Sequence, residues 1–135
     1  MQVVLKNKPE EKRKLLAALQ GFAQAENLPA GVLQAADLAL EEHLTNLMNY
    51  AYDDTLSHEI LVRCAVDQDI LVIEVEDDGA PFNPLLSPEV DTSVPLKDKP
   101  IGGLGIHLIR RFMDELHYRR EAGRNILSMR KRLAS

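Results

Sequence analysis

The amino-acid sequence predicts an α+β fold, with a largely antiparallel sheet covered on one face by helices. Apolar residues keep a helical spacing in the first part of the chain, and later segments alternate apolar and polar residues as strands do. The predicted order is two helices, a hairpin, a long loop, a third helix and a second hairpin. The 135 residues fit one compact domain, 1–135, without an internal repeat or a linker between domains.

The N-terminal half predicts a short strand followed by two helices. Residues 2–6 suit the opening strand, and Pro9, with acids directly after it, begins a helix that ends near Asn27. Pro29 can occupy the first turn of the second helix, because its missing N–H is not needed there. We expect this helix to run to about Tyr52, where a pair of aspartates breaks the apolar pattern.

The C-terminal half predicts two hairpins separated by a loop and a helix. The loop is rich in proline, which cannot donate a backbone hydrogen bond to a sheet or helix. Basic residues within 119–132 are expected to be solvated charges on strand edges. We expect strands at 59–66 and 70–76, the loop at 78–103, a helix at about 104–116, and strands at about 116–121 and 125–133.

Length and composition exclude several classes of protein. The chain is too short for a two-lobed protein kinase, and its 16 Lys+Arg against 21 Asp+Glu disfavour direct binding of nucleic acid. The single cysteine, Cys64, excludes an internal disulfide framework and a cysteine zinc site; it is expected to be a small core residue. The chain turns charged by Lys6, unlike a signal peptide, and no stretch approaches the roughly 18 apolar residues of a membrane span. We therefore expect a cytoplasmic protein that binds no membrane.

The first candidate site residues lie in the second half of the second predicted helix. Glu42 and Asn46 are about one helical turn apart and share a face, which Asn49 joins. The Glu42 carboxylate could accept a proton from a water or hydroxyl, and the Asn46 amide oxygen could bind Mg²⁺. The alternative is that both side chains simply face solvent, because Glu and Asn at this spacing are common.

The second candidate is an acid at the end of an apolar strand. Apolar residues at alternate positions share one face of the strand predicted at 70–76, and the same alternation places Asp77 on that face. A buried carboxylate needs a donor, and the exocyclic amine of a purine would serve. Gly79 would let the backbone approach a flat ligand closely. Alternatively, these residues only begin a turn, which Asp-Gly favours.

The third candidate is a glycine-rich turn before the third predicted helix. Its residues are Gly102, Gly103, Leu104 and Gly105. Exposed backbone N–H groups and the positive end of a helix suit such a turn to phosphate. It is neither a P-loop, which needs a following Lys and Ser or Thr, nor a dinucleotide fingerprint, which follows a strand. The three candidates together, in this order, are more specific than any of them alone.

The three segments resemble the N box and the two G boxes of the GHKL ATP-binding fold, which gyrase and histidine kinases share. They are residues 42–46 (EHLTN), 77–84 (DDGAPFNP) and 102–116 (GGLGIHLIRRFMDEL). The PFNP tail, the MDE of the last segment and the small size are more similar still to the stand-alone anti-sigma-factor serine kinases of bacteria. The resemblance implies a two-layer α/β sandwich, with a mixed, mostly antiparallel sheet and helices on one face.

By position, the resemblance implies a serine kinase that uses ATP and Mg²⁺. Glu42 would be the general base for the substrate serine, and Asn46 the Mg²⁺ ligand, with Asn49 also at the nucleotide. Asp77 would accept the adenine amino group, with Gly79 beside the base. Residues 83–101 would form the ATP lid, and the phosphates would lie against Gly102, Gly103, Leu104 and Gly105.

The resemblance also implies protein partners. Members of the family bind a sigma factor and phosphorylate a serine of a small antagonist protein with a STAS domain, often as homodimers. A regulator that acts on transcription through proteins has no need for a DNA-binding surface, which agrees with the acidic composition.

One departure from the family pattern lies directly before the glycine-rich turn. Many kinase members have a basic residue there, whereas this chain has Pro100 and Ile101. Lys97 and Lys99 are the nearest cations; either they reach the γ-phosphate or they are solvated loop charges. Two alternatives to an active serine kinase therefore stay open. One is a non-catalytic ATP/ADP-binding switch that regulates a protein partner, and the other is the detached catalytic domain of a histidine kinase.

Overall fold

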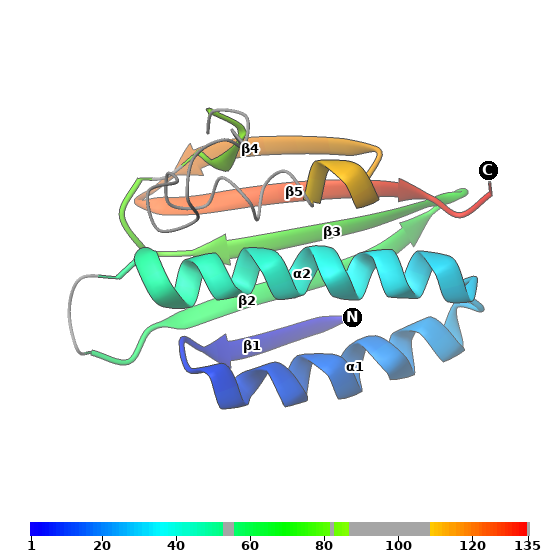
Figure 1. Ribbon diagram of the computed structural model, residues 1–135, viewed down its shortest axis with the longest axis horizontal. Helices are drawn as coiled ribbons and strands as arrows, with labels where there is room; N and C mark the ends of the chain where they lie inside the picture. Colours follow the sequence, from blue (N-terminus) through cyan, green and yellow to red (C-terminus); the bar gives the residue numbers. More distant parts are fainter. Residues whose placement is uncertain (53–55, 82, 87–108, 135) are drawn as a thin grey trace, which may run out of the picture.

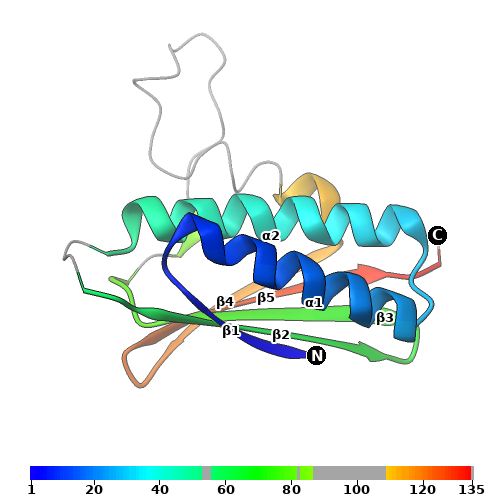
Figure 2. The ribbon, with the colours of Figure 1, turned by 90° about the horizontal axis from the view of Figure 1, so that it is seen from below.

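The computed structural model has two layers, a sheet and helices that cover one of its faces (Figures 1 and 2). It describes residues 1–52, 56–81, 83–86 and 109–134. The strands are β1 (Gln2–Lys6), β2 (Glu59–Asp67), β3 (Ile70–Asp77), β4 (Glu115–Glu121) and β5 (Arg124–Arg132). The helices are α1 (Lys12–Ala25) and α2 (Ala30–Tyr50), with short 3-10 turns η1 (Pro9–Glu11) and η2 (Pro84–Leu86).

The sheet has five strands in the order β1-β2-β3-β5-β4, so the last strand of the chain lies between β3 and β4. Each pairing between the described strands is antiparallel. The predicted α+β class, with helices on one face, is confirmed. Within the described part of the chain, the sheet has no parallel pair of the kind that a mixed sheet would contain.

Both N-terminal helices form as predicted, with small shifts at their ends. Pro9 starts the short η1, and α1 itself begins at Lys12. After α1, Asn27 has a φ of 55°, a left-handed conformation that asparagine tolerates at the end of a helix. Pro29 lies just before the first residue of α2 rather than within its first turn, and α2 ends at Tyr50.

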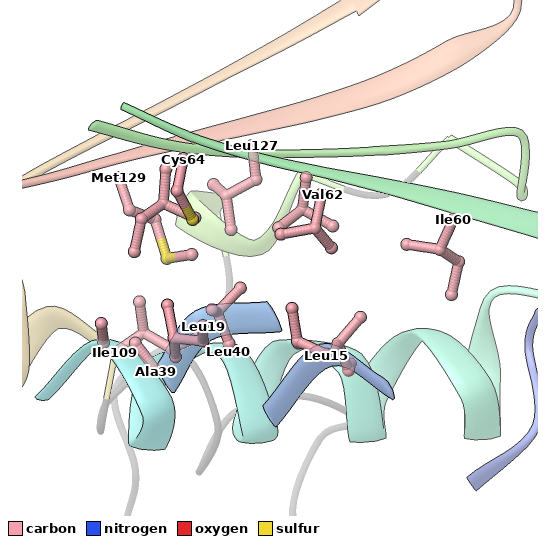
Figure 3. Close-up of a cluster of buried hydrophobic side chains, with 14 of the residues drawn as sticks. Leu15, Leu19, Ala39, Leu40, Ile60, Val62, Cys64, Ile109, Leu127 and Met129 are labelled. Carbon is pink, nitrogen blue, oxygen red and sulfur yellow. The ribbon is translucent and has the colours of Figure 1, made fainter. Parts of the chain in front are cut away.

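The core lies between α1, α2 and the inner face of the sheet (Figure 3). Alternate residues of each strand point toward the helices, as the sequence pattern predicts. Cys64 is one of them and is 2% exposed, which confirms the prediction that it is a small core residue. The fully buried side chains include Leu5, Leu19, Leu40, Leu44, Ile60, Val62, Leu71, Ile73, Val75, Ile109, Leu127 and Met129.

Only the end of the predicted third helix lies in the described part of the chain. Residues 109–112 are helical, and the side chains of Ile109 and Met113 are buried in the core. Leu116 belongs to β4, so the predicted end of this helix is wrong. The physical reason is that Leu116 also fits the alternation of the following strand. Among the described helices, none is long and apolar enough to cross a membrane.

The register of the sheet brings polar residues together at one end of the core. Asp77 on β3 is paired with Asn125 on β5, which is in turn paired with Arg120 on β4. Residues that are directly opposite in antiparallel strands share a face of the sheet, so all of these lie on the face that the helices cover. The apolar rows of β3 and β5 therefore end in a polar patch.

Candidate functional site

Asp77 is a buried carboxylate whose two oxygens have different surroundings. The residue is 1% exposed, and its Oδ2 accepts hydrogen bonds from the Gly79 N–H (2.9 Å) and from Asn125 Nδ2 (3.1 Å). No donor to Asp77 Oδ1 occurs among the described residues. Burial raises the pKa of Asp77, and the two hydrogen bonds oppose the rise because they favour the charged form. Oδ1 is thus an acceptor that a bound donor could use.

Asn125 connects Asp77 to the hairpin of β4 and β5. Its Nδ2 donates to the carbonyl oxygen of Ala80 (2.9 Å) as well as to Asp77. Its Oδ1 accepts hydrogen bonds from Tyr118 Oη (2.6 Å) and Arg120 Nη1 (3.0 Å). These donors decide the orientation of the amide, since the flipped amide would turn its own N–H groups toward them.

Gly79 lies where the end of α2 meets the segment after β3. A Cβ on Gly79 would be 2.8 Å from both the Cβ and the carbonyl oxygen of Ala51, closer than real side chains approach. The Ala51 carbonyl accepts a hydrogen bond from the Ala80 N–H (3.0 Å), and Arg120 Nη1 donates to the Gly79 carbonyl (2.9 Å). Glycine is required because two backbone segments approach so closely. The contact fixes the end of α2 beside Asp77.

Tyr52 and His58 lie beside this junction. Their rings stack with centroids 4.3 Å apart, and His58 Nδ1 is 3.2 Å from Asp78 Oδ1. Tyr52 Oη is buried and has no hydrogen-bond partner among the residues that the structure describes. Burial raises the pKa of Tyr52, and the charges of Asp77 and Asp78 raise it further. Tyr52 therefore offers this site a neutral hydroxyl that no described residue engages, which suits it to a polar ligand.

The three residues predicted on α2 lie along one side of the helix. Glu42 and Asn46 are half-buried, and Asn49 is exposed. Within the described part of the chain, the side chains of Glu42 and Asn46 have no hydrogen-bond partner. Asn46 precedes Ala51 by about 7.5 Å of helix axis. The structure thus brings this side of α2 toward the Asp77 end of the sheet, although no described contact joins Glu42 or Asn46 to Asp77.

Glu41, the acid next to Glu42, is held on a different side of α2. Lys12 Nζ on α1 lies 2.9 Å from Glu41 Oε1 and donates to Thr45 Oγ1 at 2.8 Å. Glu41 and Thr45 therefore face α1, whereas Glu42 shares its side of the helix with Asn46. The two neighbouring acids have separate environments.

The protein side chains near Asn46 could hold a magnesium ion only if a bound nucleotide supplied further oxygen ligands. In the described part of the chain, no group of three or more His, Cys, Asp and Glu side chains could hold a metal. A Mg²⁺ ion at Asn46 would take its other ligands from water and phosphate oxygens, as this ion commonly does. His43 is no candidate, because its side chain is buried in the core and Mg²⁺ takes oxygen ligands.

Several predicted site residues lie outside the described part of the chain. They are Lys97, Lys99, Gly102, Gly103, Leu104 and Gly105. The same holds for residues 87–101 of the expected lid, of which residues 83–86 are described and include η2. The assignment of these residues to the phosphates stays a prediction.

Sequence reasoning missed Asn125, Tyr118 and Arg120. Arg120 is exposed, as expected of a solvated charge, but its guanidinium also donates hydrogen bonds to the Gly79 carbonyl oxygen and to Asn125 Oδ1, which was not predicted. The alternation of side chains along β4 and β5 could have indicated the position of these three residues. It places them on the same face of the sheet as the apolar residues Leu116 and Leu127. Only the register of β3 with β5 shows that Asn125 lies opposite Asp77.

The chain matches the family model of the histidine kinase-like ATPase domain over residues 5–131. It is 29% identical over 113 residues to the serine-protein kinase RsbW of Bacillus cereus, covering 81% of this chain and 70% of that protein. Another RsbW of this species is 33% identical over 94 residues, with 67% and 58% covered. The RsbW of Oceanobacillus iheyensis is 28% identical over 121 residues, with 86% and 76% covered.

Two solved structures share the fold. The RsbU and RsbW domains of a Mycobacterium tuberculosis protein align over 98% of this chain and 32% of that chain, with a TM-score of 0.67 and 15% identity. The histidine kinase domain of a blue-light activated histidine kinase of Erythrobacter litoralis aligns over 93% and 60%, with a TM-score of 0.57 and 18% identity. At these identities the likeness shows the fold alone.

These matches confirm the resemblance that the motifs indicate. The matched range includes α2 with Glu42 and Asn46, and β3 with Asp77 at its end. The relatives found by sequence are serine-protein kinases by name, and the matched family is one of ATPase domains, which implies the use of ATP. The chain belongs to the histidine kinase-like ATPase domain family.

Proposed function

We propose that this chain is an ATP-dependent serine kinase that phosphorylates a serine of a STAS-type antagonist and sequesters a sigma factor. The observation that carries the proposal is Asp77, a buried carboxylate with one oxygen held by protein donors and the other without a described donor. Such an acceptor suits the exocyclic amine of adenine. The relatives named serine-protein kinase RsbW support transfer of the terminal phosphate to a serine.

In this proposal, each site residue has one task. Asp77 accepts the adenine amino group with Gly79 beside the base, and the neutral Tyr52 hydroxyl donates to the nucleotide or to a water next to it. Asn46 binds Mg²⁺, which neutralises charge on the phosphates, with Asn49 at the same face. The remaining contacts to phosphate come from Lys97, Lys99, Gly102, Gly103, Leu104 and Gly105.

Glu42 is the proposed general base for the serine hydroxyl. It is half-buried on the same side of α2 as Asn46, and no described residue occupies its carboxylate. Glu41 is a poorer candidate because Lys12 holds it on the side that faces α1. A base must be free to contact the incoming hydroxyl, which favours Glu42.

A second candidate function is a non-catalytic switch that binds ATP or ADP and changes its affinity for a protein partner. The observation that favours it is the sequence before the glycine-rich turn, where Pro100 and Ile101 replace the basic residue of many kinase members. A site without a cation at the γ-phosphate can bind nucleotide and still transfer phosphate poorly.

A pull-down with ATP or ADP, followed by mapping of phosphorylated residues, separates these functions. The kinase proposal expects a retained sigma factor, and a small STAS protein that gains phosphoserine only with ATP. ATP binding without any phosphoserine favours the switch, and acid-labile phosphate on a histidine favours the histidine-kinase alternative. Absence of nucleotide binding overturns all three. Light scattering of the purified chain tests the homodimer that the family resemblance implies.

A further inference from the structure

We propose that Asn125 is a positioning residue that reserves one oxygen of Asp77 for the ligand and thereby sets a preference for adenine over guanine. The inference rests on the proposed nucleotide site and deepens it. It begins from an asymmetry in the hydrogen bonds of Asp77. Both described donors, the Gly79 N–H and Asn125 Nδ2, bind the same oxygen, Oδ2. The protein thereby directs Oδ1 to another partner.

The orientation of Asn125 is imposed by the edge strand β4. Tyr118 Oη and Arg120 Nη1 both donate to Asn125 Oδ1, at 2.6 and 3.0 Å. Because a guanidinium only donates, the Asn125 amide must turn its oxygen toward Arg120 and its N–H groups toward Asp77. An apolar residue, or an amide without these two donors, would not hold Asp77 in the same way.

A charged carboxylate distinguishes the two purines by what they present at the same ring position. Adenine presents an amino donor, which the carboxylate accepts, whereas guanine presents a carbonyl oxygen, which it repels. A protonated Asp77 would carry a donor of its own and could accept guanine. Selectivity for adenine therefore requires Asp77 to stay ionised although it is buried.

Several groups decide whether Asp77 stays ionised. Burial and the neighbouring Asp78 raise its pKa, whereas the hydrogen bonds from Asn125 and Gly79 and the charge of Arg120 on β4 lower it. Loss of the Asn125 amide removes the hydrogen bond with the largest effect among those that favour the charged form.

The same face of Asp77 is also approached from the end of α2. Tyr52 lies there, and its hydroxyl is neutral at about pH 6–8, as a tyrosine normally is; burial raises its pKa further. It therefore adds no charge that could replace the Asn125 hydrogen bond. The C-terminal hairpin, through Asn125 and Arg120, thus supplies the described side chains that favour the ionised state.

The test compares Asn125→Leu and Tyr118→Phe with a matched control, Arg119→Gln. Asn125→Leu removes the donor to Asp77, and Tyr118→Phe removes one of the two groups that orient it. Arg119 neighbours Arg120 but lies on the other face of the sheet, where it contacts Glu74 and Glu121. Calorimetry gives ATP and GTP affinities at about pH 6 and about pH 8, and carbon NMR gives the titration of Asp77 in the free protein.

In Asn125→Leu we expect the ratio of ATP to GTP affinity to fall about tenfold, and further at the lower pH. Asp77 should titrate at a higher pH than in the parent chain, while Arg119→Gln changes neither property. Tyr118→Phe should change the affinity ratio and the Asp77 titration in the same directions, but by less. If Asn125→Leu does not fold, Tyr118→Phe provides the test of the positioning role. An unchanged Asp77 titration and an unchanged affinity ratio overturn the positioning role.

The two proposals fail in different ways. A parent chain that binds neither nucleotide overturns the proposed function. The Asp77 titration does not depend on a nucleotide, so an unshifted titration in both variants overturns the role of Asn125 even if the parent chain binds ATP well. A structural role alone would lower the affinities for ATP and GTP equally and leave their ratio unchanged.

Discussion

Because Gly79 has no side chain, the segment after β3 can pack closely against the end of α2. Substitution Gly79→Ala places a Cβ 2.8 Å from the Cβ and the carbonyl oxygen of Ala51 and 2.9 Å from Asp77 Oδ2. The backbone must shift to relieve these contacts, so we expect the free energy of unfolding to fall by about 1–3 kcal/mol. Urea denaturation measures the change, and an unaltered midpoint would show that the junction relaxes without cost.

Gly21 provides a control for the same chemical change. It lies inside α1, and a Cβ there would meet nothing within 4 Å. Alanine is the better helix former, so Gly21→Ala should raise stability by about 0.5–1 kcal/mol. If alanine lowers the free energy of unfolding at Gly79 and raises it at Gly21, the loss at Gly79 comes from the steric contact and not from the general effect of replacing glycine.

The neighbouring acids Glu42 and Glu41 allow an equally close comparison of function. Glu42→Gln should leave ATP affinity unchanged and reduce phosphotransfer about 100-fold or more, because the amide cannot accept the serine proton. Glu41→Gln breaks only the partly exposed pair with Lys12 and should retain phosphotransfer. Quantitative phosphoserine mapping on the proposed STAS partner checks both; equal activity of the two variants would refute the assignment of Glu42.

At the scale of the element, β2 buries a thiol that reports on its own packing. Cys64 faces the core, and burial raises its pKa to about 12. In the folded protein we expect almost no reaction with a thiol reagent at about pH 8, and rapid reaction in urea, because attack requires a thiolate that the reagent can reach. Reaction of the native protein at the rate of the unfolded chain would contradict the packing of β2.

The strands and helices themselves could largely be predicted from the sequence. In β2 and β3, inward positions are apolar at alternate residues, and this pattern is a local property. The end of the third helix was predicted too late, at Leu116, because an apolar residue at the junction of a helix and a strand fits both periods. The ends of elements are decided by contacts that a periodic pattern does not contain.

The site could be predicted only in part, for a related reason. Asp77 was placed on the inner face because parity along one strand is enough to locate it. Asn125 and Arg120 could not be assigned, because their proximity to Asp77 depends on which strands pair and in which register. Residues 97–105 lie outside the described part of the chain, so the phosphate half of the site stays a prediction.

At the scale of the whole molecule, acid should destabilise the fold through His43. Burial lowers its pKa from 6.5 to about 4. Between these pH values, His43 binds a proton in the unfolded chain but stays neutral in the folded protein. The stability that depends on neutral His43 is complete above about pH 6.5 and is lost as the pH falls to about 4. The loss at about pH 5 should be about 2 kcal/mol.

Urea denaturation at about pH 7 and about pH 5 measures this loss, with His43→Leu as the comparison. The variant has no proton to bind at this position, so its stability should depend less on pH than that of the parent chain. Asp77 acts in the opposite direction, because its pKa is raised in the folded state. Asp77 is present in both proteins, so its contribution cancels. The difference between the two proteins in how the free energy of unfolding changes with pH is therefore due to His43. Parallel slopes would contradict a neutral, buried His43.

The insertion of β5 between β3 and β4 has a consequence for how the protein is made. β3 is synthesised before β4 and β5, yet β5, the strand that pairs with its free edge, is the last strand of the sheet to be made. Until then β3 presents unpaired backbone groups, and Asp77 lacks the amide of Asn125. Nascent chains that stop short of β5 should therefore aggregate or recruit chaperones, and the proposed nucleotide site can be completed only after synthesis has passed Arg132.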